Sequence, residues 1–181
     1  GLHPEAVERL WWESGVICRA RNKILARLIH EYDLPRMLFT GHDICDNRGP
    51  MCSPEFLRKS YWPHAKYSLQ PLIDADIRLI HHCDGNIMPI VDDIIEAGFS
   101  GLQGFQYEVG VDPYELAKRR SLRGERLLFM AGLSCSRTLP FGSESDVKEE
   151  VDYIFDYTDG GQGLFLFTSN VITVETPPDN I

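Results

Sequence analysis

The side chains best suited to chemistry lie in one short run, His81–Asn86, which reads His-His-Cys-Asp-Gly-Asn. His82 and Asp84 have a spacing that suits a pair of zinc ligands, or a general acid with its orienting carboxylate. His81 and Cys83 have the same spacing. Because alternate residues of a strand face opposite sides, only one of these two pairs can point into a common site.

This run also has a plainer explanation, because a histidine–cysteine turn can simply close a strand with hydrogen bonds. Two candidate ligands also fall short of a zinc site, which normally takes at least three from the protein. Asp43 and Asp46 lie earlier in the chain. They are either catalytic carboxylates or caps of their own loop, since aspartate readily bonds backbone amides in turns. The spacing alone leaves these alternatives open.

The elements that must position these groups alternate along the chain between helices and strands. Amphipathic periodicity and proline or serine starts predict the helices, and short apolar runs that end in polar residues predict the strands. The expected helices cover residues 4–31, 53–72, 89–97, 113–118 and 145–157, and the expected strands cover residues 36–43, 77–81, 101–105, 127–133 and 164–168.

Strands that alternate with helices imply parallel pairing through right-handed crossovers. The fold class is therefore predicted to be α/β: the C-terminal portion of a (β/α)8 TIM barrel, with about five βα units. A complete barrel usually needs about 250 residues, so about three leading strands are expected to be absent. An open doubly wound sheet is the alternative, but no expected strand is followed by a GxGxxG turn.

In a parallel barrel the active site lies where the strands end, so the polar residues at those ends are the candidates. We predict that Asp43, Asp46, His82 and Asp84 are catalytic, and that His82 and Asp84 also bind a metal. Substrate-binding roles are predicted for residues on the same rim: His42, Ser53, Asn86, Gln106 and Asn170. The unpaired edges of such a partial sheet predict self-association into a homo-oligomer.

The composition excludes several classes of function. With 43% hydrophobic and 25% charged residues, positions 1–181 are expected to fold as one domain. A net charge of −9 argues against nucleic-acid binding, which needs clustered Lys and Arg. No apolar run approaches the ~20 residues that span a bilayer, so no membrane association is expected. Five cysteines without a CxxC pair suit a reducing compartment, and we expect a cytoplasmic protein.

Several strings resemble the uroporphyrinogen decarboxylase superfamily, which includes the methylcobalamin:coenzyme M methyltransferases. Gly49–Phe56 resembles the family's Gly-Pro-Met-x-Ser-Pro-Glu-x-Phe helix start, and Pro63 resembles the proline that follows it. His82–Ile87 resembles the family's His-Ser-Cys-Gly-Asn or His-Ser-Asp-Gly-Asn turn. Thr176–Ile181 resembles the ending Thr-Pro-x-Glu-Asn-Ile. The order and spacing of these strings identify the chain as a member of the superfamily.

The resemblance implies one function and leaves two alternatives. We expect a corrinoid-linked methyltransferase that passes a methyl group from methylcobalamin to a thiol, with a corrinoid protein as a partner. In the family's zinc enzymes a His-x-Cys pair and a later Cys hold the metal, and these positions match His82, Asp84 and Asn170 here. The first alternative is a decarboxylase of uroporphyrinogen type, whose last-strand histidine again matches Asn170. The second is a non-catalytic corrinoid- or tetrapyrrole-binding module.

Overall fold

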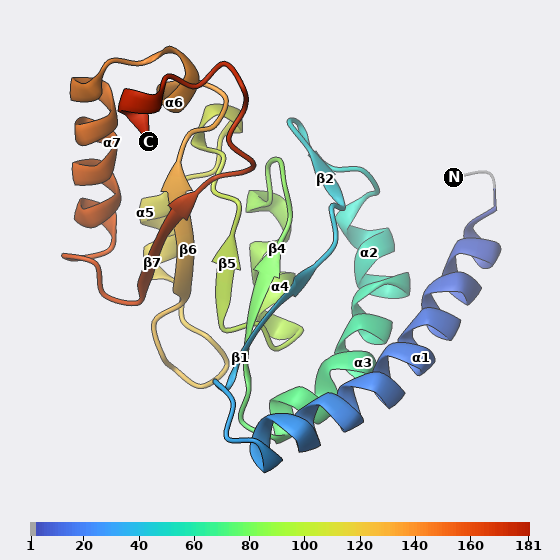
Figure 1. Cartoon of the computed structure of the whole chain (residues 1–181). Helices are drawn as coiled ribbons and strands as arrows, with labels where there is room; N and C mark the ends of the chain where they lie inside the picture. Colours follow the sequence, from blue (N-terminus) through green and yellow to red (C-terminus); the bar gives the residue numbers. More distant parts are fainter. Residues whose placement is uncertain (1–2) are drawn as a thin grey trace.

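The computed structural model describes residues 3–181, and it builds them around a five-stranded parallel sheet. Each strand of this sheet pairs with the next one along the chain, so the strand order follows the sequence (Figure 1). The strands are β1 (Met37–Gly41), β4 (Arg78–His82), β5 (Gly101–Gln103), β6 (Leu128–Leu133) and β7 (Leu164–Thr168). The fold is therefore α/β, and the carboxyl ends of all five strands lie at the same edge of the sheet.

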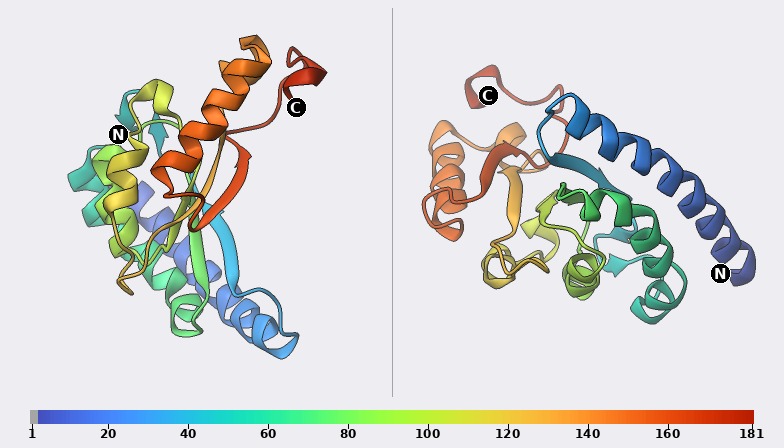
Figure 2. Two further views of the ribbon diagram at one scale, coloured as in Figure 1. Left: turned by 90° about the vertical axis from the view of Figure 1, so that its left-hand side faces the viewer. Right: turned by 90° about the horizontal axis from the view of Figure 1, so that it is seen from below.

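Helices connect the strands and cover one face of the sheet. Figure 2 shows the sheet curving, with the connecting helices on its outer side. Several helices begin with a proline, which has no amide hydrogen to satisfy. Ser53 and Ser143 cap the helices that start at Pro54 and Glu144. The α-helices are α1 (Pro4–Glu31), α2 (Pro54–Ser60), α3 (Trp62–Asp74), α4 (Val91–Glu96), α5 (Pro113–Lys118), α6 (Thr138–Phe141) and α7 (Glu144–Tyr157), and the 3₁₀ turns are η1 (Met88–Ile90), η2 (Tyr107–Val109) and η3 (Pro178–Asn180).

The hydrophobic core fills the layer between the sheet and the helices. Leu79 of β4 and Ala131 of β6 belong to one buried cluster with Ile94 of α4, Leu116 of α5 and Ile154 of α7. All five side chains are inaccessible to solvent. Burial of this apolar surface holds the helices against the sheet.

The opposite face of the sheet carries exposed aromatic side chains. Phe39 of β1, together with Phe165 and Phe167 of β7, remains 44–54% exposed. β1 and β7 are also the two edge strands of the sheet. Both edges therefore combine unpaired backbone groups with exposed aromatic rings, a combination that favours association with another chain.

The single helix expected over residues 53–72 is wrong, because the structure divides it into α2 and α3 at Tyr61. Pro63 lacks the amide hydrogen that would bond the Lys59 carbonyl, and its ring crowds that carbonyl. α3 therefore starts anew with Pro63 in its first turn, where no such bond is required. The break leaves Tyr61 at the junction, where its hydroxyl group bonds His42.

Several small elements are absent from the sequence prediction, among them a hairpin and a short helix. β2 (Cys45–Asp46) and β3 (Gly49–Pro50) form an antiparallel hairpin after β1, and α6 follows β6. Most of the other predicted elements are confirmed, although several strand ends differ by one or two residues. One difference matters for the site: the expected strand ends at His81, whereas β4 includes His82. Within residues 3–181, no helix is both long enough and apolar enough to cross a membrane.

Candidate metal centre

Three of the predicted site residues meet where β1 and β4 end. Asp43 follows β1, His82 is the last residue of β4, and Asp84 lies in the turn after it. One potential ligand atom from each of these residues lies within 4.8 Å of the other two. His82 Nε2 is 3.5 Å from Asp43 Oδ1. We call this group the Asp43–His82–Asp84 cluster.

His82 is oriented by a residue on the neighbouring strand. Its Nδ1 donates a hydrogen bond to Gln103 Oε1, and the strand register places Gln103 beside His82. An amide oxygen can only accept a hydrogen bond, so this contact places a proton on Nδ1, and in the neutral ring the Nε2 lone pair is free on the side of Asp43. Metal-binding histidines are commonly fixed in this way. The side chain is 27% exposed, which leaves it accessible to a small molecule.

Asp84 is held in place by Asp43 and by a residue near the end of the chain. Its amide group donates to Asp43 Oδ1 at 2.9 Å, and its Oδ2 accepts a hydrogen bond from Asn170 Nδ2 at 2.8 Å. Its second oxygen, Oδ1, is buried and has no hydrogen-bond partner. A buried carboxylate oxygen without a partner is unfavourable, and a metal ion would supply the missing interaction.

The donor atoms of the cluster define the ions that it suits. One imidazole nitrogen and two carboxylate groups can bind zinc, and they also suit iron(II) or manganese. Three protein ligands with an open fourth position are typical of a catalytic zinc site. Without a metal, His82 beside Asp43 has the geometry of a general base with a nearby carboxylate. The residues present therefore fit a divalent cation.

The turn after β4 depends on glycine. Gly85 has a φ of +84°, and a Cβ atom there would lie 2.5 Å from the Asp46 carbonyl oxygen. Gln106 Oε1 accepts a hydrogen bond from the Gly85 amide group. Asn86 donates its amide hydrogen to the Asp46 carbonyl oxygen at 3.0 Å, and its Oδ1 accepts from the Met88 amide group at 3.1 Å. Gln106 and Asn86 thus support the turn that carries Asp84.

His81 and Cys83 point away from the cluster, as strand alternation requires. The His81 ring packs against Trp62 and Phe99, with ring centroids 6.1 and 4.7 Å away. Burial lowers the pKa of His81 to about 3, with a smaller contribution from nearby His42. His81 is therefore neutral at physiological pH. Cys83 is also buried, and its thiol donates to the Asp84 carbonyl oxygen.

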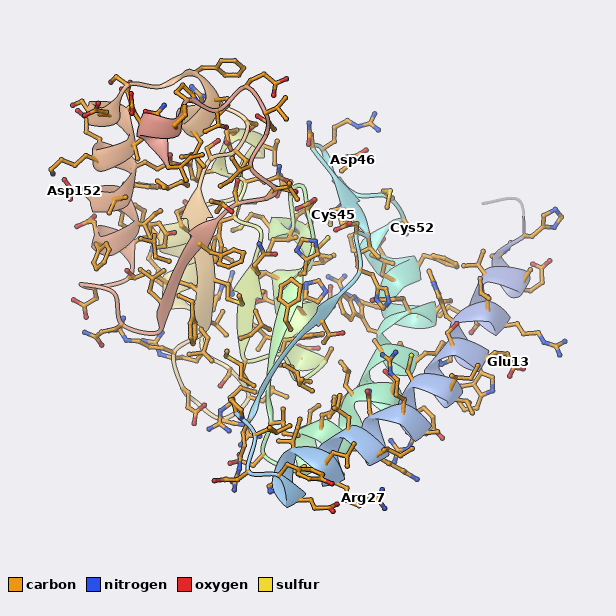
Figure 3. The ribbon with its side chains drawn as sticks, in the orientation of Figure 1. Glu13, Arg27, Cys45, Asp46, Cys52 and Asp152 are labelled. Carbon is orange, nitrogen blue, oxygen red and sulfur yellow. The ribbon has the colours of Figure 1, made fainter. Side chains whose placement is uncertain are left out.

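Asp46 does not join the cluster. Its carboxylate pairs with Arg48 at 2.9 Å, and this hydrogen-bonded guanidinium lowers the pKa of the carboxyl group. Figure 3 shows Asp46 at the tip of the β2–β3 hairpin. The Asp46 backbone nevertheless matters to the site, because its carbonyl oxygen accepts the Asn86 amide hydrogen. The structure thus places Asp46 in support of the turn.

His42 and Ser53 also lie outside the cluster. His42 Nδ1 bonds the Tyr61 hydroxyl group at 2.9 Å and lines a cavity of about 420 Å³ between α1, α3 and β1. None of the three cluster residues lines that cavity. Ser53 Oγ accepts the Phe56 amide hydrogen and so caps α2. The structure brings Asp43, His82, Asp84 and Asn170 together and leaves these two apart.

Sequence reasoning assigns no role to Gln103 and predicts only two metal ligands. The signal for Gln103 was its place at the end of the third predicted strand, next to the strand that ends in His82. The third ligand position was equally visible, since Asp43 follows the first strand. A scan of protein-family models gave no match, and searches of curated proteins and of solved structures found no similar protein.

Proposed function

We propose that this chain belongs to the uroporphyrinogen decarboxylase superfamily and transfers a methyl group from a corrinoid, such as methylcobalamin, to a thiol. The observation that carries this proposal is the three-residue donor set of the Asp43–His82–Asp84 cluster. It lies at the carboxyl ends of parallel strands, where enzymes built on (β/α)8 barrels hold their active sites. The five parallel strands are compatible with part of such a barrel.

The proposed metal is zinc, held by Asp43, His82 and Asp84. Zinc bound there would lower the pKa of a coordinated thiol and so supply a thiolate at neutral pH. Gln103 would keep His82 in the required tautomer, and Asn170 would orient Asp84. The resemblance implies thiolate ligands where Asp84 and Asn170 stand. A donor set of one nitrogen and two carboxylates is harder than that one, so weaker zinc binding is expected.

Zinc binding is the first test of this proposal. We expect metal-free protein to bind about one equivalent of Zn²⁺ in a calorimetric titration, because the three donors form one site. His82→Ala should weaken the binding at least about a hundredfold, since it removes the only nitrogen ligand. His42→Ala is the matched control, because this histidine on the same rim bonds Tyr61 and lies outside the cluster. Equal zinc affinity in the wild type and His82→Ala would contradict the proposed site.

Methyl transfer is the second test. Methylcobalamin and 2-mercaptoethanesulfonate are mixed with zinc-loaded protein, and the absorbance of the corrinoid is followed. The methyl group passes from cobalt to sulfur, the thiol proton goes to solvent, and cob(I)alamin and a thioether are formed. We expect this reaction in the wild type and its loss in His82→Ala. A spectral shift of cobalamin without a thioether product would instead favour a non-catalytic corrinoid-binding module.

Decarboxylation of a uroporphyrinogen-type substrate is less well supported. Holding several carboxylates requires cations, and the Asp43–His82–Asp84 cluster itself brings two carboxylates of its own. Arg48, the arginine on the nearby hairpin, is already paired with Asp46. Conversion of uroporphyrinogen by this protein, with no methyl transfer, would reverse the preference.

Self-association is part of the same proposal. The edge strands β1 and β7 and the exposed rings of Phe39, Phe165 and Phe167 support it. Light scattering should give a mass of at least twice the 20.6 kDa of the chain. A corrinoid protein remains a second expected partner, and adding one should raise the rate of methyl transfer. A monodisperse monomer would remove the first of these expectations.

A further inference from the structure

A second group of carboxylates lies at the end of β6, away from the Asp43–His82–Asp84 cluster. Glu150 of α7 accepts the Ser134 amide hydrogen on its Oε1 at 2.9 Å. Glu108 of η2 accepts the Ser134 hydroxyl hydrogen on its Oε1, and the same oxygen accepts from Ser136 Oγ at 3.1 Å. Two carboxylates from distant parts of the chain therefore contact one residue.

Both carboxylates keep one buried oxygen without a partner. Oε2 of Glu108 and Oε2 of Glu150 are inaccessible and accept no hydrogen bond, and Glu150 as a whole is only 8% exposed. The Tyr107 hydroxyl group is buried and unpartnered as well, and its ring lies 5.9 Å from that of Tyr153, one turn after Glu150. Both carboxylates reach Ser134, so this residue brings η2 and α7 together just after the end of β6.

Neither carboxylate has a positive partner. Within residues 3–181, no Lys, Arg or His side chain forms an ion pair with Glu108 or Glu150. Burying an unpaired carboxylate is strongly unfavourable unless a proton or a cation neutralises it. The pKa of Glu150 is raised to about 7 by burial, against a smaller opposing effect of the Ser134 amide group. Glu150 is therefore buried without an ion-pair partner.

We propose that Glu108 and Glu150 bind a divalent, oxygen-liganded cation of the calcium class. Two carboxylates balance two positive charges, and Ser134 Oγ and Ser136 Oγ add neutral oxygens at the same place. Among the residues that the structure describes, no His or Cys joins Glu108 and Glu150 in a three-ligand group, so the pair suits a metal that prefers oxygen over zinc. Calcium accepts such irregular sets of oxygen ligands more readily than magnesium does.

Calcium binding can be measured directly. Chelator-treated protein is titrated with CaCl₂ while thermal unfolding is followed, and Tb³⁺, which replaces Ca²⁺, is titrated while its luminescence is excited through the nearby tyrosines. We expect a rise in the unfolding temperature with Ca²⁺ and saturable Tb³⁺ luminescence that excess Ca²⁺ removes. Absence of both signals in the wild type would overturn the proposal, and would leave a shared proton as the way the pair is neutralised.

Variants locate the binding. Glu150→Gln and Glu108→Gln should each weaken Ca²⁺ binding by about tenfold or more, because each removes one of two negative ligands. Asp152→Asn is the matched control, since its carboxylate lies on the outer side of α7 (Figure 3) and pairs with Lys148. Because both Glu150→Gln and Glu108→Gln are tested, the result does not depend on either variant folding normally. Full Ca²⁺ affinity in both glutamate variants would contradict the site.

The two metal proposals can fail independently. His82→Ala should lose Zn²⁺ binding and keep the Ca²⁺-dependent rise in unfolding temperature. Glu150→Gln should lose the Ca²⁺ effect and keep Zn²⁺ binding, because its carboxylate contacts Ser134 just after β6, whereas His82 ends β4. If His82→Ala removed the Ca²⁺ effect, the calcium would be bound at the Asp43–His82–Asp84 cluster and the second site would be excluded.

Discussion

Two groups of carboxylates lie at the same edge of the sheet and differ in almost every other respect. The Asp43–His82–Asp84 cluster combines nitrogen with oxygen, and its Asp43 side chain is 56% exposed. Glu108 and Glu150 offer oxygen only, and Glu150 is buried. An open, mixed donor set suits a metal that must meet a substrate, whereas a closed oxygen set suits an ion that holds elements together. The edge of one sheet can therefore serve both chemistry and stability.

The largest expected effect is at the turn after β4, which carries Asp84 of the Asp43–His82–Asp84 cluster. Gly85→Ala places a Cβ atom 2.5 Å from the Asp46 carbonyl oxygen at a φ of +84°. We expect a loss of about 4 kcal/mol in the free energy of unfolding, together with loss of Zn²⁺ binding. Denaturant unfolding and calorimetry measure the two effects.

Gly124→Ala is the control for that change. Gly124 also has a positive φ, +75°, but a Cβ atom there meets nothing within 4 Å. The free energy of unfolding of Gly124→Ala should fall only by the cost of backbone strain, about 1 kcal/mol, and Zn²⁺ binding should not change. Ca²⁺ binding should persist in folded Gly85→Ala protein, and its disappearance would show that the two groups are not independent.

The second prediction concerns the pH dependence of stability that Glu150 causes. The pKa of Glu150 is raised from 4.5 to about 7, so the folded protein holds this proton more tightly than the unfolded chain does. Its contribution to stability is complete below pH 4.5 and is lost as the pH rises through about 7. With chelator present, Glu150→Gln should gain about 2 kcal/mol relative to the wild type between pH 4.5 and 7.5. Urea unfolding at several pH values tests this, and parallel profiles would refute it.

The third prediction concerns support of the exposed group. Asn170→Ala removes the hydrogen bond to Asp84 Oδ2 and leaves all three ligands in place. Loss of such an orienting contact should reduce Zn²⁺ affinity about tenfold, which is about 1.4 kcal/mol. Ca²⁺ binding at Glu108 and Glu150 should be unaffected. An unchanged Zn²⁺ affinity would mean that Asp84 needs no support from Asn170.

The smallest expected effect lies outside both groups. Ser53→Ala removes the side-chain cap of α2, which should cost about 1 kcal/mol of stability. Zn²⁺ and Ca²⁺ affinities should both stay at the wild-type value, because Ser53 contacts neither group. A fall in methyl-transfer activity without a fall in stability would restore the substrate-binding role that the sequence predicts for this serine.

The sequence predicts the elements that depend on local signals. α1, α5 and β7 have the expected bounds, because a proline begins each helix and a short apolar run forms the strand. The break at Tyr61 follows from a local signal too, namely Pro63. The sequence prediction missed this break, because apolar residues at helical spacing continue on both sides of the proline.

The candidate site is only partly predictable, because its contacts join distant segments. Alternation along one strand separates His82 and Asp84 from His81 and Cys83. The hydrogen bond between Asp84 and Asn170 spans 86 residues and needs the fifth strand to reach the same edge as the second. The shared contact of Glu108 and Glu150 with Ser134 likewise depends on how α7 packs, which no short stretch of sequence specifies.

The strand order of the sheet also has a consequence for how the chain folds. Each strand of the five-stranded sheet pairs with the strand that precedes it within that sheet. Met37 pairs with Arg78 and Ile80 with Gly101, so every pairing must close a long stretch of chain, and parallel sheets of this kind form slowly. Each strand can nevertheless add to an edge that the preceding strand of the sheet already provides. In that sequence of events the Asp43–His82 contact forms with the second strand, whereas the Asp84–Asn170 hydrogen bond forms only with the last.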